Sequence, residues 1–278
     1  MKTRAAVLRE RNSPWSVEEI ELDPPKAGEV LVKMVASGIC HSDEHLVTGH
    51  FGFAAPMPPI IGGHEGSGIV QEVGEGVTSV APGDHVVFSF VPSWGRCPSC
   101  VRGRSNICDV GAGIATGLQI TDGTSRHHTL DGVDLPLMCI LGTFAEHTVV
   151  NEASCVKMQP EWPLDKAALL GCGVATGWGS AVNVADVGPG DFVCVVGVGG
   201  IGAAAIQGAR VAGARVIAAI DPVEFKRDEA KRFGATHTYA SIAEALENLG
   251  ESTWGRGFDK TIMCAGEGSG DMLGEAFW

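Results

Sequence analysis

The sequence predicts an α/β plus β fold, in which an irregular β domain is followed by a doubly wound parallel sheet covered by helices. Up to about residue 150, short apolar runs such as residues 30–35 and 84–88 are separated by Gly and Pro, which is typical of strands joined by turns. From about residue 165, apolar runs alternate with longer amphipathic segments, as in β-α-β units. We therefore expect domains at residues 1–165 and 166–278.

Composition and charge restrict the classes of partner. The chain has 278 residues, of which 45% are hydrophobic and 19% are charged, so it is long and apolar enough to form two cores. Its formal net charge of -13 would repel a phosphate backbone or an anionic membrane surface, so we expect no nucleic-acid and no membrane partner. The sequence shows neither a signal-peptide core nor an apolar run long enough to span a bilayer, which predicts a cytoplasmic protein.

The cysteines indicate metal or thiol chemistry rather than a disulfide framework. There are nine of them, an odd number in a large chain, and three are clustered as Cys97, Cys100 and Cys108. Disulfide frameworks are typical of short secreted chains with paired cysteines. A reducing compartment therefore fits the count better.

The elements of the two parts can be placed in outline. In the first part we expect one short helix, which Ser42 and Asp43 can cap and which runs to about residue 47. In the second part, glycines end two of the expected helices, and Ser241 with Glu244 forms a capping box for a third. The expected strands and helices are 192–196, 201–212, 216–220, 224–233, 242 to about 249, and 260–264.

A glycine-rich loop follows the first strand of the second part. Residues 197–202 read GVGGIG and contain G-x-G-x-x-G, which alone is a weak signal in a chain with 39 glycines. Its position between a strand and a helix strengthens it. The first glycine permits a tight turn, the second lets the backbone approach a pyrophosphate, and the third lets the helix pack close to the sheet. The loop therefore predicts a Rossmann dinucleotide site at Gly197, Gly199, Gly200 and Gly202.

An acidic residue then selects the dinucleotide. Asp221 ends the second strand, nineteen residues after Gly202, where a carboxylate can accept hydrogen bonds from ribose hydroxyls. Its charge disfavours the 2′-phosphate of NADP, so we predict NAD(H). Lys226 can lie beside the same ribose, although an ordinary solvated helix charge is an equal alternative. The alternative for the loop as a whole is a structural turn without a ligand.

Three candidate metal ligands lie far apart in the sequence. Cys40 follows Gly38-Ile39, His64 follows Gly62-Gly63, and Cys172 lies between Gly171 and Gly173. Their spacing does not show that they converge, and a single buried Cys or His is more often part of a core than a ligand.

The sequences of these segments, however, resemble those of one known family. Residues 40–43 (CHSD), 63–68 (GHEGSG) and 170–177 (LGCGVATG), with the glycine loop, look like the zinc-dependent medium-chain alcohol dehydrogenases in order and sequence. Residues 122–126 and 141–144 resemble the long-loop branch that includes the liver-type and glutathione-dependent formaldehyde dehydrogenases. Residues 15–20 and 224–228 look like an actinobacterial subgroup of NDMA-dependent, nicotinoprotein-type enzymes, some of which keep their cofactor bound. The resemblance covers essentially the whole chain.

The resemblance implies a GroES-like catalytic domain with a zinc site, followed by an NAD-binding domain. In such enzymes Cys40, His64 and Cys172 would be the three protein ligands of a catalytic Zn²⁺. Two thiolates and an imidazole suit tetrahedral zinc, and the fourth position would stay open for water or a substrate oxygen.

The resemblance also implies roles for the neighbouring residues. Glu65 would lie behind the metal, and Asp43 would orient His64. Ser42 would link the substrate hydroxyl to a proton relay that ends at His45, although simple helix capping is the alternative for Ser42 and Asp43.

Two further residues have weaker assignments of the same kind. His41 would face the cofactor pyrophosphate, with a surface histidine as the alternative. Phe90 would line the substrate pocket, unless it is an ordinary core aromatic. The implied reaction moves a hydride from a zinc-bound primary alcohol, or an aldehyde adduct, to NAD⁺.

The sequence departs from the family at a second, structural zinc site. The family uses four cysteines in C-x2-C-x2-C-x7-C, and here Cys97, Cys100 and Cys108 match the last three while Trp94 takes the first place. An indole cannot ligate zinc, so this segment alone cannot form a closed four-thiolate site. Either the lobe is metal-free, or water or a distant side chain completes the set; we expect a weakened or empty site.

The second departure concerns length. A full dinucleotide-binding domain has about six parallel strands, and about four can be placed before residue 278. Family members continue further and dimerise through the later strands, so we expect a fragment whose full-length form is a homo-oligomer. The alternative to an active enzyme is an inactive zinc- and nucleotide-binding remnant, and a third reading, which is still an enzyme, is a zinc-free quinone reductase relative. Cys40, His64 and Cys172 argue against the latter.

Overall fold

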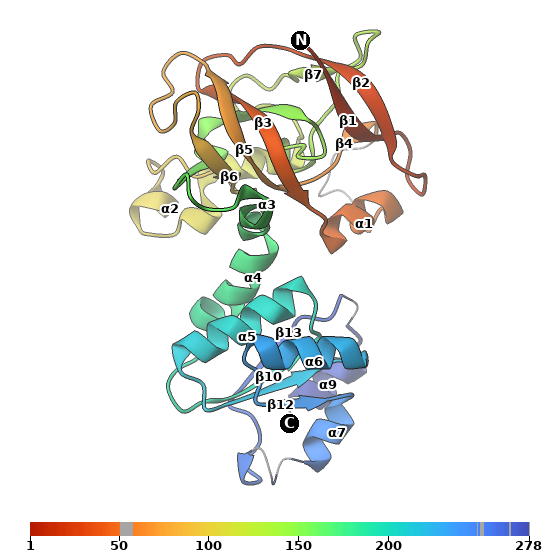
Figure 1. The fold of residues 1–278 in the computed structure, drawn as a ribbon, viewed down its shortest axis with the longest axis vertical. Coiled ribbons are helices and arrows are strands. Elements are labelled where there is room, and N and C mark those ends of the chain that lie inside the picture. The colour runs from red at the N-terminus through yellow and green to blue at the C-terminus, as the bar shows by residue number, and fades with distance from the viewer. Residues whose placement is uncertain (51–57, 249, 251–252, 267, 278) are drawn as a thin grey trace. The chain divides into compact units, whose positions relative to one another are not determined.

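The computed structural model describes residues 1–50, 58–248, 250, 253–266 and 268–277. It contains two compact units, Met1–Cys172 and Gly173–Trp278, shown in red to green and in green to blue (Figure 1). The first unit is built on antiparallel sheets and the second on a parallel sheet, as an α/β plus β fold requires.

The first unit contains two antiparallel sheets. The larger sheet has the order β8-β3-β5-β6-β9, and the smaller has the order β4-β1-β2-β7. Their strands are β1 (Lys2–Leu8), β2 (Ser16–Leu22), β3 (Glu29–Gly38), β4 (Ile60–Ile61), β5 (Glu65–Val73), β6 (His85–Phe88), β7 (His127–His128), β8 (His147–Asn151) and β9 (Cys155–Met158).

An apolar core fixes the register of the larger sheet. Val30, Val32, Val70 and Phe88 are buried together on one face, because successive side chains of a strand alternate between the two faces. The β3–β5 pairing shifts register near Met34, and a Cβ on Gly68 would lie 2.4 Å from the Lys33 carbonyl oxygen. Only glycine therefore permits this close approach of the two strands.

Short helices connect the strands of the first unit. They are α1 (His41–Thr48), α2 (Pro98–Val101) and α3 (Leu164–Ala167), with 3-10 turns at Ser105–Ile107, Asp109–Ala115, Met138–Ile140, Glu152–Ser154 and Ala168–Gly171. Helix α1 forms where it was predicted, but its cap differs. Cys40 is the N-cap residue, and Asp43 completes a capping box by accepting a hydrogen bond from the Cys40 N–H at 2.8 Å. Ser42 is therefore inside the first turn and is not the cap.

The division between the units lies seven residues beyond the expected boundary at 165/166. Helix α3 packs on the first unit, because Leu164 and Ala167 share an apolar cluster with Val87. The Ser67 hydroxyl also donates a 2.6 Å hydrogen bond to the Leu164 carbonyl. These contacts keep residues 164–172 with the antiparallel sheets.

The second unit is a four-stranded parallel sheet in the order β12-β11-β10-β13. In chain order this is 3-2-1-4, the arrangement of a Rossmann sheet around its switch point. The elements are α4 (Gly173–Gly179), a π-helical turn (Ser180–Val184), β10 (Phe192–Val196), α5 (Gly200–Ala212), β11 (Val216–Ile220), α6 (Glu224–Phe233), β12 (His237–Tyr239), α7 (Ile242–Glu247), β13 (Lys260–Met263) and α9 (Gly270–Ala276).

Helices cover both faces of this sheet. Val193 and Val195 of β10 pack against apolar residues of α5 and α6, whereas Cys194 and Val196 face a second cluster that includes Ile242 of α7. A strand that is buried on both faces is expected to be continuously apolar, as residues 192–196 are. The predicted end of the α7 segment, near residue 249, lies outside the described residues.

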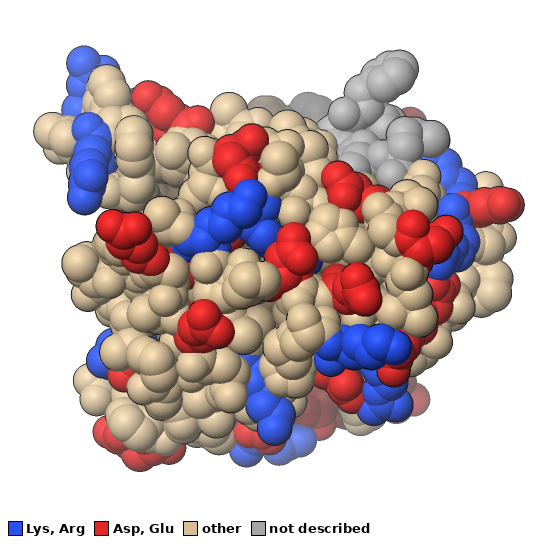
Figure 2. All heavy atoms as spheres, turned by 90° about the horizontal axis from the view of Figure 1, so that it is seen from above, with Lys and Arg blue, Asp and Glu red and all other residues tan. Residues whose placement is uncertain are grey.

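Charges on the surface are mixed. Figure 2 shows basic and acidic side chains interspersed over the face that it displays. Two of the ion pairs in the first unit are Lys2 with Glu19 and Arg4 with Glu146. Within the described residues, no single helix has the length and apolarity to cross a membrane. One bent pair of helical segments, Leu164–Gly171 and Gly173–Val184, is long and apolar enough only when the two segments are counted together.

Candidate functional site

The candidate metal ligands of the first unit come from three segments that the fold brings together. Strands β3 and β5 are antiparallel neighbours, with Gly38 opposite Glu65. The end of β3 therefore lies beside the start of β5, which places Cys40 next to His64. Gly171 brings in the third segment, because a Cβ there would lie 2.7 Å from the Phe88 carbonyl oxygen. Cys172 follows directly.

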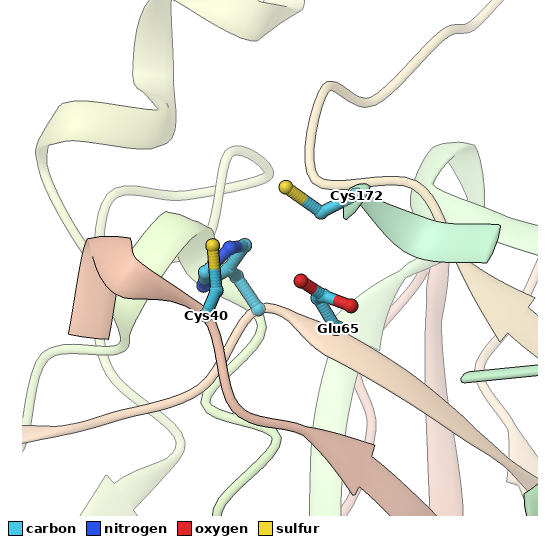
Figure 3. Close-up of side chains that lie close together, drawn as sticks. Cys40, Glu65 and Cys172 are labelled. Atoms are coloured by element: carbon cyan, nitrogen blue, oxygen red, sulfur yellow. The ribbon is translucent and has the colours of Figure 1, made fainter. Parts of the chain in front are cut away.

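One donor atom from each of Cys40, His64, Glu65 and Cys172 lies within 4.8 Å of the others. Figure 3 shows the two sulfurs and the Glu65 carboxylate directed toward the same space, from three different segments. His64 and Glu65 are buried, and the two cysteines are partly buried. The arrangement offers two sulfurs, a nitrogen and an oxygen to one ion.

His64 has unused hydrogen-bonding capacity. Its ring is 3% exposed, and within the described residues neither ring nitrogen has a hydrogen-bond partner. The Nδ1 atom lies 3.6 Å from Asp43 Oδ1, close enough for a charge interaction but too far for a hydrogen bond. A buried unsatisfied polar atom costs about 1–3 kcal/mol, which a metal–nitrogen bond would offset.

Electrostatics also suit a cation. The neighbouring Cys172, followed by His64 and Ser42, lowers the pKa of Cys40 to about 3 despite its burial. Burial alone would lower the pKa of His64, but Asp43 and Cys40 outweigh it and raise the pKa to about 9. Burial, followed by the negative charge of Cys40, raises the pKa of Glu65 to about 7. The site thus gathers negative charge that a divalent ion would neutralise.

These donors fit Zn²⁺. Zinc favours thiolate and imidazole ligands in a tetrahedral set, and a carboxylate is an accepted further ligand. Glu65 belongs to the same group of donor atoms, so its carboxylate is a further protein donor at this site.

Helix α1 carries the residues assigned to proton transfer and cofactor contact. The backbone N–H of Ser42 donates to Cys40 Sγ, with the nitrogen 3.5 Å from the sulfur. His45, one turn further, packs edge-on against His41 with ring centroids 4.6 Å apart and against His50 at 5.5 Å. Ser42 therefore lies at the candidate metal centre, and His41 is exposed.

Two other side chains lie close to the centre. The Phe90 ring is edge-on to His64, with centroids 6.2 Å apart. Cys139, which the sequence analysis did not single out, has its pKa raised to about 12 by burial, followed by the charges of Asp43 and Cys40. Its backbone is left-handed, with φ of 51°. No motif surrounds Cys139, so only the fold reveals its position.

A second thiol cluster lies elsewhere in the first unit. Sulfur atoms of Cys97, Cys100 and Cys108 all lie within 4.8 Å of one another. Trp94, at the place of the first cysteine in the family's pattern, is 48% exposed. The structure thus assembles the three thiols that the sequence matched to the family pattern.

The glycine loop of the second unit has the geometry that a dinucleotide site needs. Gly197 has φ of +91°, and a Cβ on Gly202 would lie 1.9 Å from the Gly197 carbonyl oxygen. The first glycine thus turns the chain and the last lets α5 pack close. At Gly199, the N-cap of α5, and at Gly200, a Cβ would meet nothing within 4 Å. Open space therefore faces the N-terminus of a thirteen-residue helix, where anions bind.

Asp221 lies beside this loop. Its carboxylate accepts hydrogen bonds from the backbone N–H of Val198 at 2.9 Å and of Val223 at 3.0 Å. Lys226 Nζ is 3.8 Å from the Asp221 carboxylate, and the Arg227 guanidinium donates to the Asp221 carbonyl. The carboxylate is therefore held in place at the carboxyl end of β11, next to the predicted pyrophosphate site.

Two family models match the chain. The alcohol dehydrogenase GroES-like domain matches residues 26–160, and the zinc-binding dehydrogenase model matches residues 200–276. The first match covers most of the antiparallel unit, including Cys40, His64 and Glu65. The second begins at the glycine loop.

Similar proteins agree with these models. Alcohol dehydrogenase B of Mycobacterium tuberculosis is 52% identical over 267 residues, covering 96% of this chain and 70% of that protein. An NDMA-dependent alcohol dehydrogenase of Amycolatopsis methanolica is 48% identical, covering 100% and 73%. A crystal structure of an alcohol dehydrogenase zinc-binding domain protein from Burkholderia ambifaria superposes with a TM-score of 0.88 at 30% identity, covering 99% and 73%. The chain therefore belongs to the zinc-dependent medium-chain alcohol dehydrogenase family.

Proposed function

We propose that this chain transfers a hydride between a primary alcohol, or an aldehyde adduct, and NAD(H), with a catalytic Zn²⁺ held by Cys40, His64 and Cys172. The convergence of these three side chains carries the proposal, together with the buried His64 ring, whose two nitrogens have no hydrogen-bond partner among the described residues. The bound ion would act as a Lewis acid toward the substrate oxygen.

The residues around the ion have distinct tasks. Asp43 holds the His64 ring by its charge, while its other carboxylate oxygen caps α1. Ser42, whose backbone N–H lies 3.5 Å from Cys40 Sγ, takes the proton of the substrate hydroxyl and passes one on to His45, its neighbour one turn along α1.

The preference for NAD(H) rests on Asp221. Its carboxylate is fixed by two backbone N–H groups and keeps acceptor lone pairs for the ribose hydroxyls. A phosphate on the ribose would meet a buried negative charge there, with Lys226 near but already paired to Asp221.

The Cys172→Ser variant tests the proposal. Oxidation of a primary alcohol is measured with NAD⁺ and, because the Amycolatopsis relative is named as NDMA-dependent, also with NDMA as acceptor. We expect kcat/KM to fall at least about 100-fold, since a Lewis acid supplies several kcal/mol in the transition state. NAD(H) affinity should stay within about threefold of the original, because the loop lies in the other unit.

Cys155→Ser is the matched control, since Cys155 is also a partly buried thiol of the first unit but belongs to neither thiol cluster. Unchanged activity in Cys172→Ser would refute the ligand assignment. A chain that binds both zinc and NAD(H) without any hydride transfer would instead identify a binding remnant.

A further inference from the structure

The segment that carries His64 and Glu65 packs against a residue that offers no donor atom to the metal site. Thr143 contacts both glycines that flank this dipeptide. A Cβ on Gly63 would collide with the Thr143 hydroxyl oxygen, and a Cβ on Gly66 would lie 2.6 Å from the Thr143 Cγ2 atom. Thr143 is only 2% exposed. Its side chain is therefore enclosed against the backbone on either side of the two donor residues.

Hydrogen bonds hold the residue before His64 from two directions. The backbone N–H of Thr143 donates to the Gly63 carbonyl at 3.1 Å, and the Gly63 N–H donates to Asp43 Oδ1 at 3.2 Å. Gly63 has φ of +85°, in the left-handed region that favours glycine. Both backbone polar groups of Gly63 are thus bound, and no side chain separates it from Thr143.

Two hydroxyl groups extend this contact to Glu65. The Ser37 hydroxyl donates to the Glu65 carbonyl at 2.9 Å and lies 2.7 Å from the Thr143 hydroxyl. The Thr143 hydroxyl itself is 3.5 Å from that carbonyl. Since a serine has one hydroxyl proton and Ser37 makes the shorter bond, Thr143 is the donor between the two side chains. The order of donation is therefore Thr143 to Ser37 to Glu65.

The His64 ring depends on this backbone for its direction. Neither ring nitrogen has a hydrogen-bond partner within the described residues, and Nδ1 is 3.6 Å from Asp43 Oδ1. In most metal sites, a hydrogen bond from the second ring nitrogen orients the histidine. Without such a bond, the positions of the neighbouring residues Gly63 and Glu65 decide where the ring points.

We propose that Thr143, acting through Ser37, is a positioning residue of the candidate metal centre. It holds His64 and Glu65 where their donor atoms meet the two thiols. Removal of the Thr143 hydroxyl leaves every ligand in the chain but lets the backbone of the dipeptide shift, which weakens metal binding at this site specifically. The inference rests on the proposed function, because it takes the zinc site as its starting point.

The Thr143→Val variant removes the hydroxyl and keeps the shape of the side chain. The metal-free full chain is titrated with Co²⁺, and the visible absorption that Cys172→Ser abolishes is taken as the signal of the site. We expect Thr143→Val to bind Co²⁺ there about 10–100-fold more weakly, the loss that outer partners of metal ligands cause. The d–d bands should also shift, because they report the geometry of the ligands.

Two further variants separate positioning from stability. Thr143→Ser keeps the hydroxyl, so its Co²⁺ affinity should stay within about threefold of the original with unshifted bands. Thr148→Val is the matched control: Thr148 is also a buried threonine of the first unit, and its hydroxyl bonds the Leu141 carbonyl at 2.7 Å. This control should lower the midpoint of thermal unfolding, as Thr143→Val does, but leave Co²⁺ affinity and bands unchanged.

The outcomes distinguish this inference from the proposed function. If Cys172→Ser abolishes the signal but Thr143→Val keeps the original affinity and bands, the inference is wrong and the proposed function stands. If Cys172→Ser keeps the full signal, both are wrong. Equal weakening in Thr148→Val, or no recovery in Thr143→Ser, would also overturn the inference.

The Ser37→Ala variant provides the same test if Thr143→Val does not fold. It removes the hydroxyl that donates to the Glu65 carbonyl, so Co²⁺ affinity should fall and the bands should shift in the same direction. An unchanged titration of Ser37→Ala would contradict the inference.

Discussion

His127 is a buried imidazole on β7 that has little to stabilise a charge. Its side chain is fully buried, Nε2 is 3.3 Å from the Thr148 hydroxyl, and Nδ1 has no hydrogen-bond partner within the described residues. Burial, followed by the positive charges of His128 and Arg126, lowers the pKa of His127 to about 3. The folded protein therefore holds this ring neutral.

This single residue should make stability depend on pH. In the unfolded chain a histidine has a pKa of about 6.5. Below that pH the unfolded state therefore binds a proton at this residue, whereas the folded state keeps it neutral. Stability contributed by neutral His127 is present above pH 6.5 and is lost as pH falls toward 3. Between pH 7 and 5 this amounts to about 2 kcal/mol.

The His127→Gln variant isolates this contribution, because glutamine keeps a polar side chain of similar reach without titrating. Urea unfolding at pH 7 and pH 5 should show the original chain losing about 2 kcal/mol more than the variant. Equal losses in both chains would show that His127 does not carry the effect.

At the scale of elements, two glycines of the β10–α5 turn have different roles, one in packing and the other in ligand binding. A Cβ on Gly202 would overlap the Gly197 carbonyl, whereas one on Gly199 would meet open space, and Gly199 has a φ of -89° that any residue adopts. Glycine is therefore favoured at these two positions for different physical reasons. Gly202 serves the contact between strand and helix, and Gly199 serves the approach of a pyrophosphate.

Alanine substitutions should separate these roles. Gly202→Ala should lower the free energy of unfolding by about 1–3 kcal/mol, because backbone must move to admit the methyl group. Gly199→Ala should change it by less than about 1 kcal/mol, yet weaken NAD(H) binding at least about tenfold. Thermal unfolding and fluorescence titration with NADH measure the two effects. Wild-type affinity in Gly199→Ala would place the cofactor elsewhere.

At the scale of the whole molecule, each unit has its own apolar core. Val30, Val70 and Phe88 belong to a cluster of the first unit, and Val195 and Ile217 to one of the second. The candidate catalytic zinc ligands all lie within Met1–Cys172, and the glycine loop and Asp221 lie within Gly173–Trp278. Each ligand should therefore stabilise mainly the unit that holds it.

Hydrogen exchange followed by mass spectrometry checks this expectation. Ligand at 100 times its Kd stabilises the state that binds it by about 2.7 kcal/mol. Added Zn²⁺ should slow exchange mainly in residues 1–172, and NAD(H) mainly in residues 173–278. Cys172→Ser should reduce the zinc effect around residues 40 and 64 and keep the NAD(H) effect. Protection by NAD(H) confined to residues 1–172 would contradict the assignment of the glycine loop.

The second unit shows how much local pattern can determine. Strands 192–196 and 216–220 and helix 224–233 have the predicted bounds, because each is a continuous apolar or amphipathic segment closed by Gly or Asp. The short β12 (His237–Tyr239) and α9 (Gly270–Ala276) were not predicted. The three residues of β12 carry no clear apolar period, and its place in the sheet comes from pairing with β11.

In the first unit the sequence by itself determined which residues carry donor atoms, and likeness to a family suggested which of them act together. Only the tertiary structure decided their proximity: antiparallel pairing of β3 with β5 sets Cys40 beside His64, and the close approach at Gly171 adds Cys172. The buried ion pair between Arg126 and Glu29, whose residues are 97 positions apart, likewise could not be predicted from the sequence. Side-chain chemistry is local and can be recognised from short segments, whereas contacts between distant segments depend on strand register and packing that no short segment contains.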